Sequence, residues 1–159
     1  LWHGDAESLR YVGNSANHVY SFVKSGETRF LRLTSSRDRT KGQIEAELDF
    51  IAYLRRGGIN AMPPILSAVE RFIEELSSAN GSLFACVFEE AKGERFRYDS
   101  TKINKEHFRL RGRTLGQVHA LSKDYVPSGG FRRFAWNEDK LLFDVEDFLP
   151  NATPRKLFG

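Results

Sequence analysis

The chain has 159 residues and a mass of 18.2 kDa, the size of one ordinary domain or of one lobe with part of another. Hydrophobic residues make up 40% of it, and no apolar run approaches the roughly 20 residues of a membrane helix. The net charge is only +3, from 24 Lys and Arg against 21 Asp and Glu, with both signs interspersed. We therefore expect neither a membrane-spanning segment nor a nucleic-acid-binding stripe, and an RNA-binding domain would rest only on the pI of 9.1.

Cysteine usage and the start of the chain bear on its compartment. The single cysteine, Cys86, lies inside the apolar run LFACVF, so an internal disulfide is impossible and a buried thiol is expected. No charged segment followed by an apolar one resembles a secretion signal. We therefore expect a cytoplasmic protein. The chain begins at Leu1 rather than at a methionine, which indicates a trimmed fragment.

Three strands are predicted at the start of the chain: Ser8–Val12, His18–Lys24 and Thr28–Thr34. The tight turn SGE joins the last two, which favours a hairpin. In the third strand, Phe30 and Arg32 alternate with Leu31 and Leu33, so the two pairs are expected on opposite faces of a sheet. This alternation places a charged side chain in the middle of an apolar strand.

A long helix is predicted in the run TKGQIEAELDFIAYLRRGG. Thr40 and Gln43 make a capping box, and Gly57-Gly58 supplies a stop at the other end. Apolar residues recur at helical spacing: Ile44, Leu48, Phe50, Ile51 and Leu54. Because these residues surround Glu47, its carboxylate projects from the apolar stripe and needs a partner.

Two further strands are predicted after the MPP break, at Ala68–Leu76 and Leu83–Phe88. Asn80-Gly81 between them is a strong hairpin signal. The apolar residues of VERFIEEL also fit helical spacing, which leaves a helix as the alternative for the first of the two.

The second half of the chain is predicted to be mostly helical. A helix is expected over Asn104–Lys123, and an amphipathic helix over EDKLLFDVEDFL, ended by Pro150. Strands followed by helices predict an α+β fold, with the junction near Ala91–Gly93.

Arg32 and Glu47 are the most informative pair of charged residues. The order of strand and capped helix would bring them together, and an Arg held by a Glu presents a fixed fork of donors that suits phosphate oxygens. The alternatives are a structural ion pair without a ligand, or an edge-strand Arg that faces water.

Five segments in order resemble one family: VGNSANHVYSF, RFLRL, QIEAELDFIAYLRRGGINAMPP, LFACVFEEAKGERF and RTLGQVHALSKDY. They are similar to the amino-terminal half of the aminoglycoside phosphotransferase and choline kinase-like family of small-molecule kinases. The resemblance implies a protein-kinase-like N-lobe, with an antiparallel sheet of about five strands and one long helix, over residues 1–91. It implies a hinge and the first helices of the C-lobe over residues 92–159.

The resemblance also implies roles for single residues. Arg32 matches the basic residue that grips the α- and β-phosphates of the nucleotide, and Glu47 matches the helix glutamate that pairs with it. Most protein kinases have Lys at the first position, and an Arg there alters the geometry while keeping the charge and the ability to bind phosphate.

The segment GNSANHVY matches the loop over the nucleotide phosphates. It has one glycine, Gly13, where protein kinases have three, so the contacts would come from backbone N–H groups and from the Ser15 hydroxyl. The residues implied are Asn14, Ser15, Ala16 and Asn17. Without the resemblance, the segment would be interpreted as a polar hairpin turn.

The run CVFEEAKG matches the hinge between the lobes. Phe88 would line the back of the adenine pocket, a role compatible with that of a core aromatic. The carbonyl of Glu89 and the N–H of Ala91 would pair with the adenine edge.

The chemistry of this family sits in a later loop, His-x-Asp-x-x-x-x-Asn. This motif does not occur after Tyr125, so the resemblance assigns no catalytic residue and no metal ligand to this chain. His3-Gly4-Asp5 lacks the Asn, because Arg10 stands in its place. We interpret it as a chance match in a flexible lead-in.

The resemblance thus implies a fragment of an ATP- or GTP-dependent phosphotransferase that acts on a small-molecule hydroxyl. Its partners would be the nucleotide with Mg²⁺, whose protein ligands lie outside this chain, and the small-molecule acceptor, with no nucleic acid and no membrane. The alternative is a non-catalytic kinase-like module that binds a nucleotide or a protein. The acceptor is not indicated by the sequence.

Overall fold

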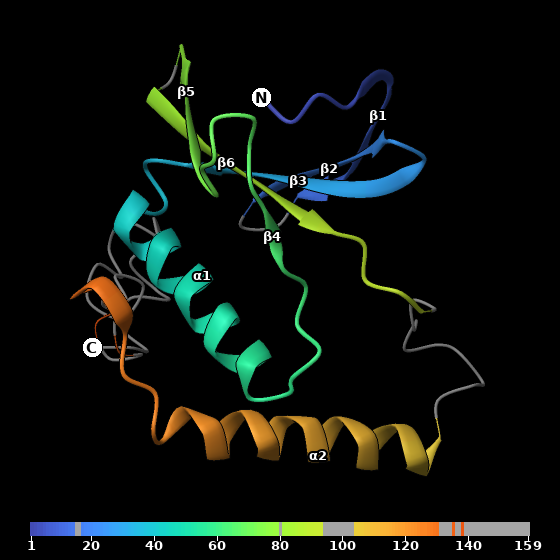
Figure 1. Cartoon of the computed structure of the whole chain (residues 1–159), viewed down its shortest axis with the longest axis vertical. Helices are drawn as coiled ribbons and strands as arrows, with labels where there is room; N and C mark the ends of the chain where they lie inside the picture. Colours follow the sequence, from blue (N-terminus) through green and yellow to red (C-terminus); the bar gives the residue numbers. More distant parts are fainter. Residues whose placement is uncertain (15–16, 80, 94–103, 131–134, 136–137, 139–159) are drawn as a thin grey trace, which may run out of the picture.

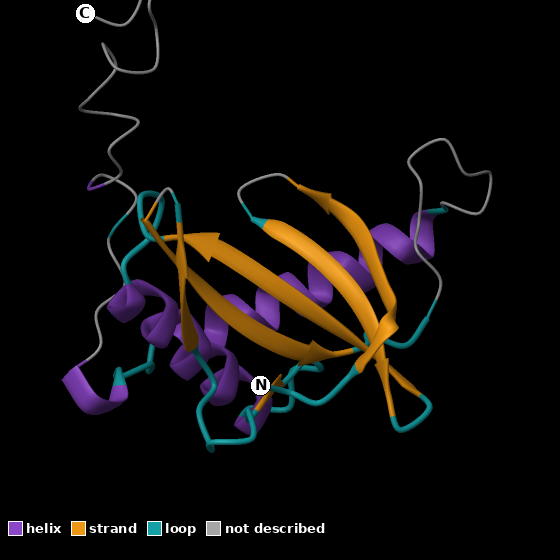
Figure 2. Cartoon of the chain, turned by 90° about the horizontal axis from the view of Figure 1, so that it is seen from above, coloured by secondary structure: helices purple, strands orange, loops and turns teal. Residues whose placement is uncertain are grey.

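The computed structural model describes residues 1–14, 17–79, 81–93, 104–130, 135 and 138. Its strands are β1 (Asp5–Asn14), β2 (His18–Lys24), β3 (Glu27–Ser35), β4 (Pro64–Ile65), β5 (Glu74–Ser78) and β6 (Gly81–Glu89). Its helices are α1 (Lys41–Arg56), α2 (Lys105–Ser122) and the short 3₁₀ turn η1 (Ser128–Gly130). Both long helices lie on one face of the sheet (Figures 1 and 2).

The strands form one antiparallel sheet in the order β1-β2-β3-β6-β4, and β5 also pairs with β6. The predicted α+β fold is therefore confirmed, with six strands rather than about five. None of the helices in the described residues is long and apolar enough to cross a membrane. The helix predicted over EDKLLFDVEDFL falls almost wholly outside the described residues.

The prediction of a strand from Ala68 was wrong, as was its helical alternative, because β5 begins only at Glu74. The preceding residues form a turn in which the Ser67 N–H donates to the Arg71 carbonyl at 2.8 Å. Glu70 in this turn has a φ of 59°, which fits neither a strand nor a helix. The two-residue strand β4 was not predicted, because it begins at Pro64, which a sheet accepts at an edge.

Helix α1 begins where the sequence predicts. The Thr40 hydroxyl accepts from the Gln43 N–H at 3.2 Å, and the Gln43 side chain accepts from the Thr40 N–H at 2.8 Å. This reciprocal capping box satisfies two donors that the first turn would leave unpaired. The helix is thereby fixed at the end that follows β3.

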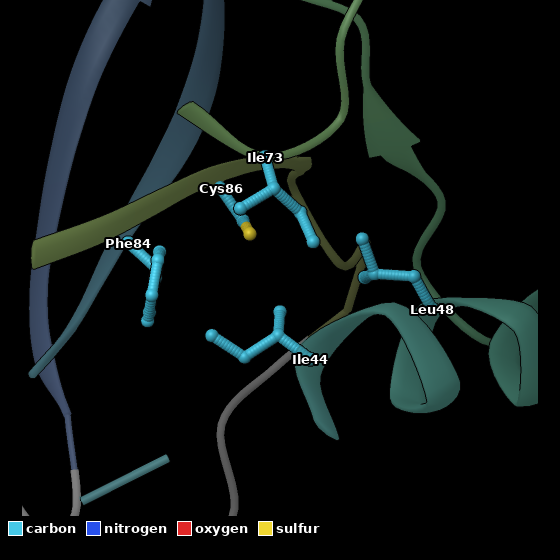
Figure 3. Close-up of a cluster of buried hydrophobic side chains, with 5 residues drawn as sticks. All are labelled: Ile44, Leu48, Ile73, Phe84 and Cys86. Atoms are coloured by element: carbon cyan, nitrogen blue, oxygen red, sulfur yellow. The ribbon is translucent and has the colours of Figure 1, made fainter. Parts of the chain in front are cut away.

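The two faces of the sheet carry separate cores. The face toward α1 holds one cluster of buried side chains (Figure 3): Ile44, Leu48, Ile73, Phe84 and Cys86. The opposite face holds the other: Trp2, Phe22, Ala85 and Val87. Leu31 and Leu33 pack against this second cluster, while Arg32 reaches α1. The predicted alternation along β3 is therefore confirmed.

The first residues of the chain are not a flexible lead-in. Trp2 is only 7% exposed, and its indole N–H donates to the Ile65 carbonyl at 3.0 Å. The Leu1 carbonyl accepts from the Ala68 N–H at 2.8 Å. A Cβ atom at Gly4 would lie 2.1 Å from the Phe22 ring, so glycine is required for this close approach. The segment is part of the second core.

Candidate functional site

An ion pair links the sheet to α1. Arg32 Nη1 donates to Glu47 Oε1 at 2.5 Å, and the two side chains are 18% and 30% exposed. Arg32 lies on β3, between Val19 of β2 and Cys86 of β6 in the register. Glu47 follows the buried Ala46 and precedes the buried Leu48 on α1. The sheet and the capped helix thus bring together the two residues that the sequence predicts to pair.

Two nitrogen atoms of the Arg32 guanidinium, which carry three of its five N–H groups, make no hydrogen bond to an oxygen of the described residues. Its Nε and Nη2 atoms are buried and have no hydrogen-bond partner among the described residues. A guanidinium has five N–H donors in a fixed plane, and buried donors without a partner are rare and costly. The Cys86 sulfur beside them in the register is only a weak acceptor, so these donors suit the oxygens of an anion.

Phe88 lies against the same guanidinium. The Arg32 Cζ atom is 5.1 Å from the centroid of the Phe88 ring, within the range of a cation–π contact. One nitrogen of the guanidinium is thus bonded to a carboxylate, and its central carbon lies over an aromatic ring. The family resemblance implies a place for Phe88 at the back of the adenine pocket, and the contact with Arg32 was not predicted.

The β1–β2 loop contacts the face of β3 that carries Arg32. The Thr34 hydroxyl donates to Asn17 Oδ1 at 2.6 Å, and Thr34 is 2% exposed. Arg32 and Thr34 are two residues apart on one strand, so their side chains share a face. Asn14 pairs with His18 at the base of the loop. Ser15 and Ala16 lie outside the described residues.

The predicted hinge overlaps the end of β6, whose last two residues are Phe88 and Glu89. The pairing of β3 with β6 ends at Arg29 and Glu89, and Ala91 lies two residues beyond, exposed. No backbone hydrogen bond joins the Ala91 N–H to another residue of the described chain. Phe88, Glu89 and Ala91 therefore run from the partly buried end of β6 into the exposed chain that follows it.

Cys86 lies opposite Arg32 in the register and is 1% exposed. Burial raises the pKa of its thiol, and the nearby Arg32 cation opposes this rise only partly. The thiol is therefore neutral at physiological pH and is a packing group of the α1 side of the sheet. The expectation of a buried structural thiol is confirmed.

A groove of about 690 Å³ lies along another side of α1. Its lining includes Leu48, Ala52, Pro63 and Phe72. None of the described residues that the family resemblance assigns to nucleotide binding lines this groove, so it is separate from the Arg32 site.

Comparisons with known proteins agree with one another. The model of the family described as "Phosphotransferase enzyme family" matches residues 9–154. Amicoumacin kinase from Bacillus subtilis (strain 168) is 28% identical over 138 residues, which cover 86% of this chain and 40% of that protein. The chain thus spans about two fifths of the length of this curated relative.

Solved structures of small-molecule kinases also match this chain. A structure of an amicoumacin kinase in complex with AMP-PNP, Ca²⁺ and Ami has a TM-score of 0.81 and 28% identity, covering 89% of this chain and 43% of that one. A microcompartment-associated aminopropanol kinase has a TM-score of 0.72 and 23% identity, covering 88% and 42%, and shares the fold.

Proposed function

Because the chain belongs to the phosphotransferase enzyme family, we propose that it supplies the nucleotide-binding part of an ATP- or GTP-dependent kinase for a small-molecule hydroxyl. Residues 1–91 form the nucleotide-binding lobe in this proposal, and residues 92–159 form the hinge and the first part of the helical lobe. The similarity to amicoumacin kinase supports a small-molecule acceptor. The acceptor itself is left open.

The observation that carries this proposal is the pair of buried donors on Arg32. Glu47 holds one nitrogen of the guanidinium, while Nε and Nη2 have no partner among the described residues. In phosphoryl transfer, the protein acts mainly by positioning the phosphates and stabilising their charge. A cation that Glu47 holds in place meets this need, because the direction of its remaining N–H groups is set before a phosphate binds.

The other predicted residues are proposed around this centre. Asn14, Ser15, Ala16 and Asn17 would cover the phosphates, and the bond from Thr34 to Asn17 anchors the end of that loop. Phe88 would separate the adenine from the core. The carbonyl of Glu89 and the N–H of Ala91 would contact the adenine edge.

A divalent metal would neutralise charge on the transferred phosphoryl group. No residue of this chain is proposed as its ligand, because the sequence contains no His-x-Asp-x-x-x-x-Asn motif. We propose that the metal ligands and the Asp that orients the acceptor lie outside these 159 residues. The role proposed for this chain is therefore binding of the nucleotide rather than transfer.

Calorimetric titration of the chain with Mg²⁺-ATP and with adenosine tests the proposal. We expect ATP to bind at least about tenfold more tightly than adenosine, because a charge-assisted hydrogen bond contributes about 1.5–3 kcal/mol and 1.4 kcal/mol corresponds to about tenfold. Amide NMR signals near Arg32 should respond to ATP, and those from Glu89 to Ala91 should respond to both ligands. Equal affinity for the two ligands, or no response near Arg32 at millimolar ATP, would contradict the proposal.

A further inference from the structure

Helix α1 is held on two sides. Glu47 and Asp49 are two residues apart, which places them about 200° apart around a helix with 3.6 residues per turn. Glu47 faces the sheet and binds Arg32. Asp49 faces away, toward the residues that follow α2, and accepts from the Tyr125 hydroxyl at 2.6 Å. The position of α1 therefore depends on contacts on both of these sides.

The contacts on the second side form a clasp, which we define by seven residues: Asp49, Phe50, Tyr53, Gly57, Leu121, Tyr125 and Ser128. Asp49 accepts from the Ser128 N–H at 3.1 Å and also from the Ser128 hydroxyl. Burial acts to raise the pKa of Asp49, but the hydrogen bonds from Ser128 and Tyr125 and the charge of Arg56 outweigh it, so this pKa is lowered. The carboxylate is thus ionised at neutral pH and accepts three charge-assisted hydrogen bonds.

Aromatic and backbone contacts complete the clasp. The Tyr125 ring packs at centroid distances of 4.9 Å from Phe50 and 5.0 Å from Tyr53. The Tyr53 hydroxyl donates to the Leu121 carbonyl at 2.9 Å. A Cβ atom at Gly57 would lie 2.6 Å from Leu121 Cδ1, so α1 and α2 meet at a position where only glycine fits without rearrangement. Figure 1 shows the two helices meeting at these ends.

The two sides of α1 differ in how firmly they set its position. Apolar packing of Ile44 and Leu48 against the sheet tolerates small shifts, because it is non-directional. The Arg32–Glu47 hydrogen bond, at 2.5 Å, is directional and is lost after only a small shift of the helix. The hydrogen bonds that Asp49 accepts and the one that Tyr53 donates are directional, so they restrain the rotation of α1 and its position along its axis. These two quantities decide whether Glu47 reaches Arg32.

We propose that Asp49 and Tyr125 are positioning residues that fix α1 to the segment after α2, hold Glu47 on Arg32, and so couple the helical part of the chain to phosphate binding. This inference rests on the proposed function, because it assigns a role to residues that do not touch the nucleotide. It predicts that changes to Asp49 or Tyr125 weaken the binding of phosphate by Arg32 and leave the contacts with adenine unchanged.

The test compares ATP and adenosine binding in three single variants of the chain. Tyr125→Phe removes one hydroxyl and keeps the ring packing. Asp49→Asn removes the negative charge that accepts hydrogen bonds from Tyr125 and Ser128. Each should weaken ATP binding at least about fivefold, the lower end of usual coupling between sites, and leave adenosine binding unchanged. Asp124→Asn is the matched control, because Asp124 is an exposed neighbour of Tyr125 outside the clasp, and it should change neither affinity.

A double-mutant cycle shows whether the clasp acts through Arg32. In an Arg32→Ala background, Tyr125→Phe should have no further effect on ATP affinity, because the restrained group is gone. Additive losses would overturn the inference and indicate a separate effect on folding or on the ligand. Unchanged ATP affinity in both Tyr125→Phe and Asp49→Asn would also overturn it.

The NMR signal of the Arg32 Nε–H group, recorded without nucleotide, keeps the two proposals distinguishable. It should shift and broaden in Tyr125→Phe and stay unchanged in Asp124→Asn. A wild-type chain that binds ATP no better than adenosine contradicts the proposed function, and the coupling to phosphate with it. An Arg32 signal that is unchanged in Tyr125→Phe contradicts the positioning role, whatever the affinity for ATP.

Discussion

The Arg32→Ala variant is expected to bind ATP about 100-fold more weakly than the wild-type chain, with unchanged affinity for adenosine. Charge-assisted hydrogen bonds contribute about 1.5–3 kcal/mol each, and about 2.7 kcal/mol corresponds to 100-fold. Arg32 offers two nitrogen atoms, Nε and Nη2, for such bonds. Calorimetric titration with Mg²⁺-ATP and with adenosine measures both affinities.

Three further variants separate charge, geometry and position. Arg32→Lys keeps the charge but not the planar fork, so its loss of ATP affinity should be smaller than that of Arg32→Ala. Glu47→Gln keeps the size of the side chain but loses the ion pair, so it should weaken ATP binding and spare adenosine. Arg29→Ala is the control, because Arg29 lies on the same strand and pairs with Glu27. If Arg29→Ala and Arg32→Ala weaken ATP binding equally, Arg32 has no special role.

The Trp2→Ala variant is expected to lower the free energy of unfolding by about 3–5 kcal/mol, the usual cost of removing a buried Trp or Phe side chain. Trp2 packs with Phe22, Ala85 and Val87 on the face of the sheet opposite α1. Its indole also supplies the donor for the Ile65 carbonyl. Chemical denaturation monitored by circular dichroism measures the loss.

Trp2→Phe and Leu9→Ala are the matched variants for this prediction. Trp2→Phe keeps most of the ring burial and removes the hydrogen bond to Ile65, so its cost should be closer to 1 kcal/mol. Leu9 is 46% exposed, and Leu9→Ala should change stability by about 0.5 kcal/mol or less. A Trp2→Ala chain as stable as Leu9→Ala would show that the first residues do not belong to the core in solution.

The sequence predicts those parts of the fold that local chemistry determines. The capping residue Thr40, the alternation of Arg32 with Leu31 and Leu33, and the position of Cys86 in an apolar run are each local patterns, and the structure agrees with all three. Long elements follow from such patterns because each residue adds to the same periodic signal.

The features that the sequence did not predict depend on contacts between distant residues. Trp2 meets Ile65 across 63 positions, and Asp49 meets Tyr125 across 76. No periodic pattern links such residues, and a Tyr or an Asp near the end of a helix is ordinary on its own. The contact of Arg32 with Phe88 has the same origin, because it requires the register of β3 and β6.

Cys86 gives the protein a built-in reporter of opening. It is the one cysteine of the chain, and it lies between the sheet and α1, packed with Ile44 and Leu48 and opposite Arg32 in the register. A thiol reagent can reach it only when this interface separates, so the rate of modification in the native protein measures how often that happens. Ligands that hold α1 more firmly on the sheet should therefore slow the modification of this single sulfur atom, and no cysteine needs to be introduced for the measurement.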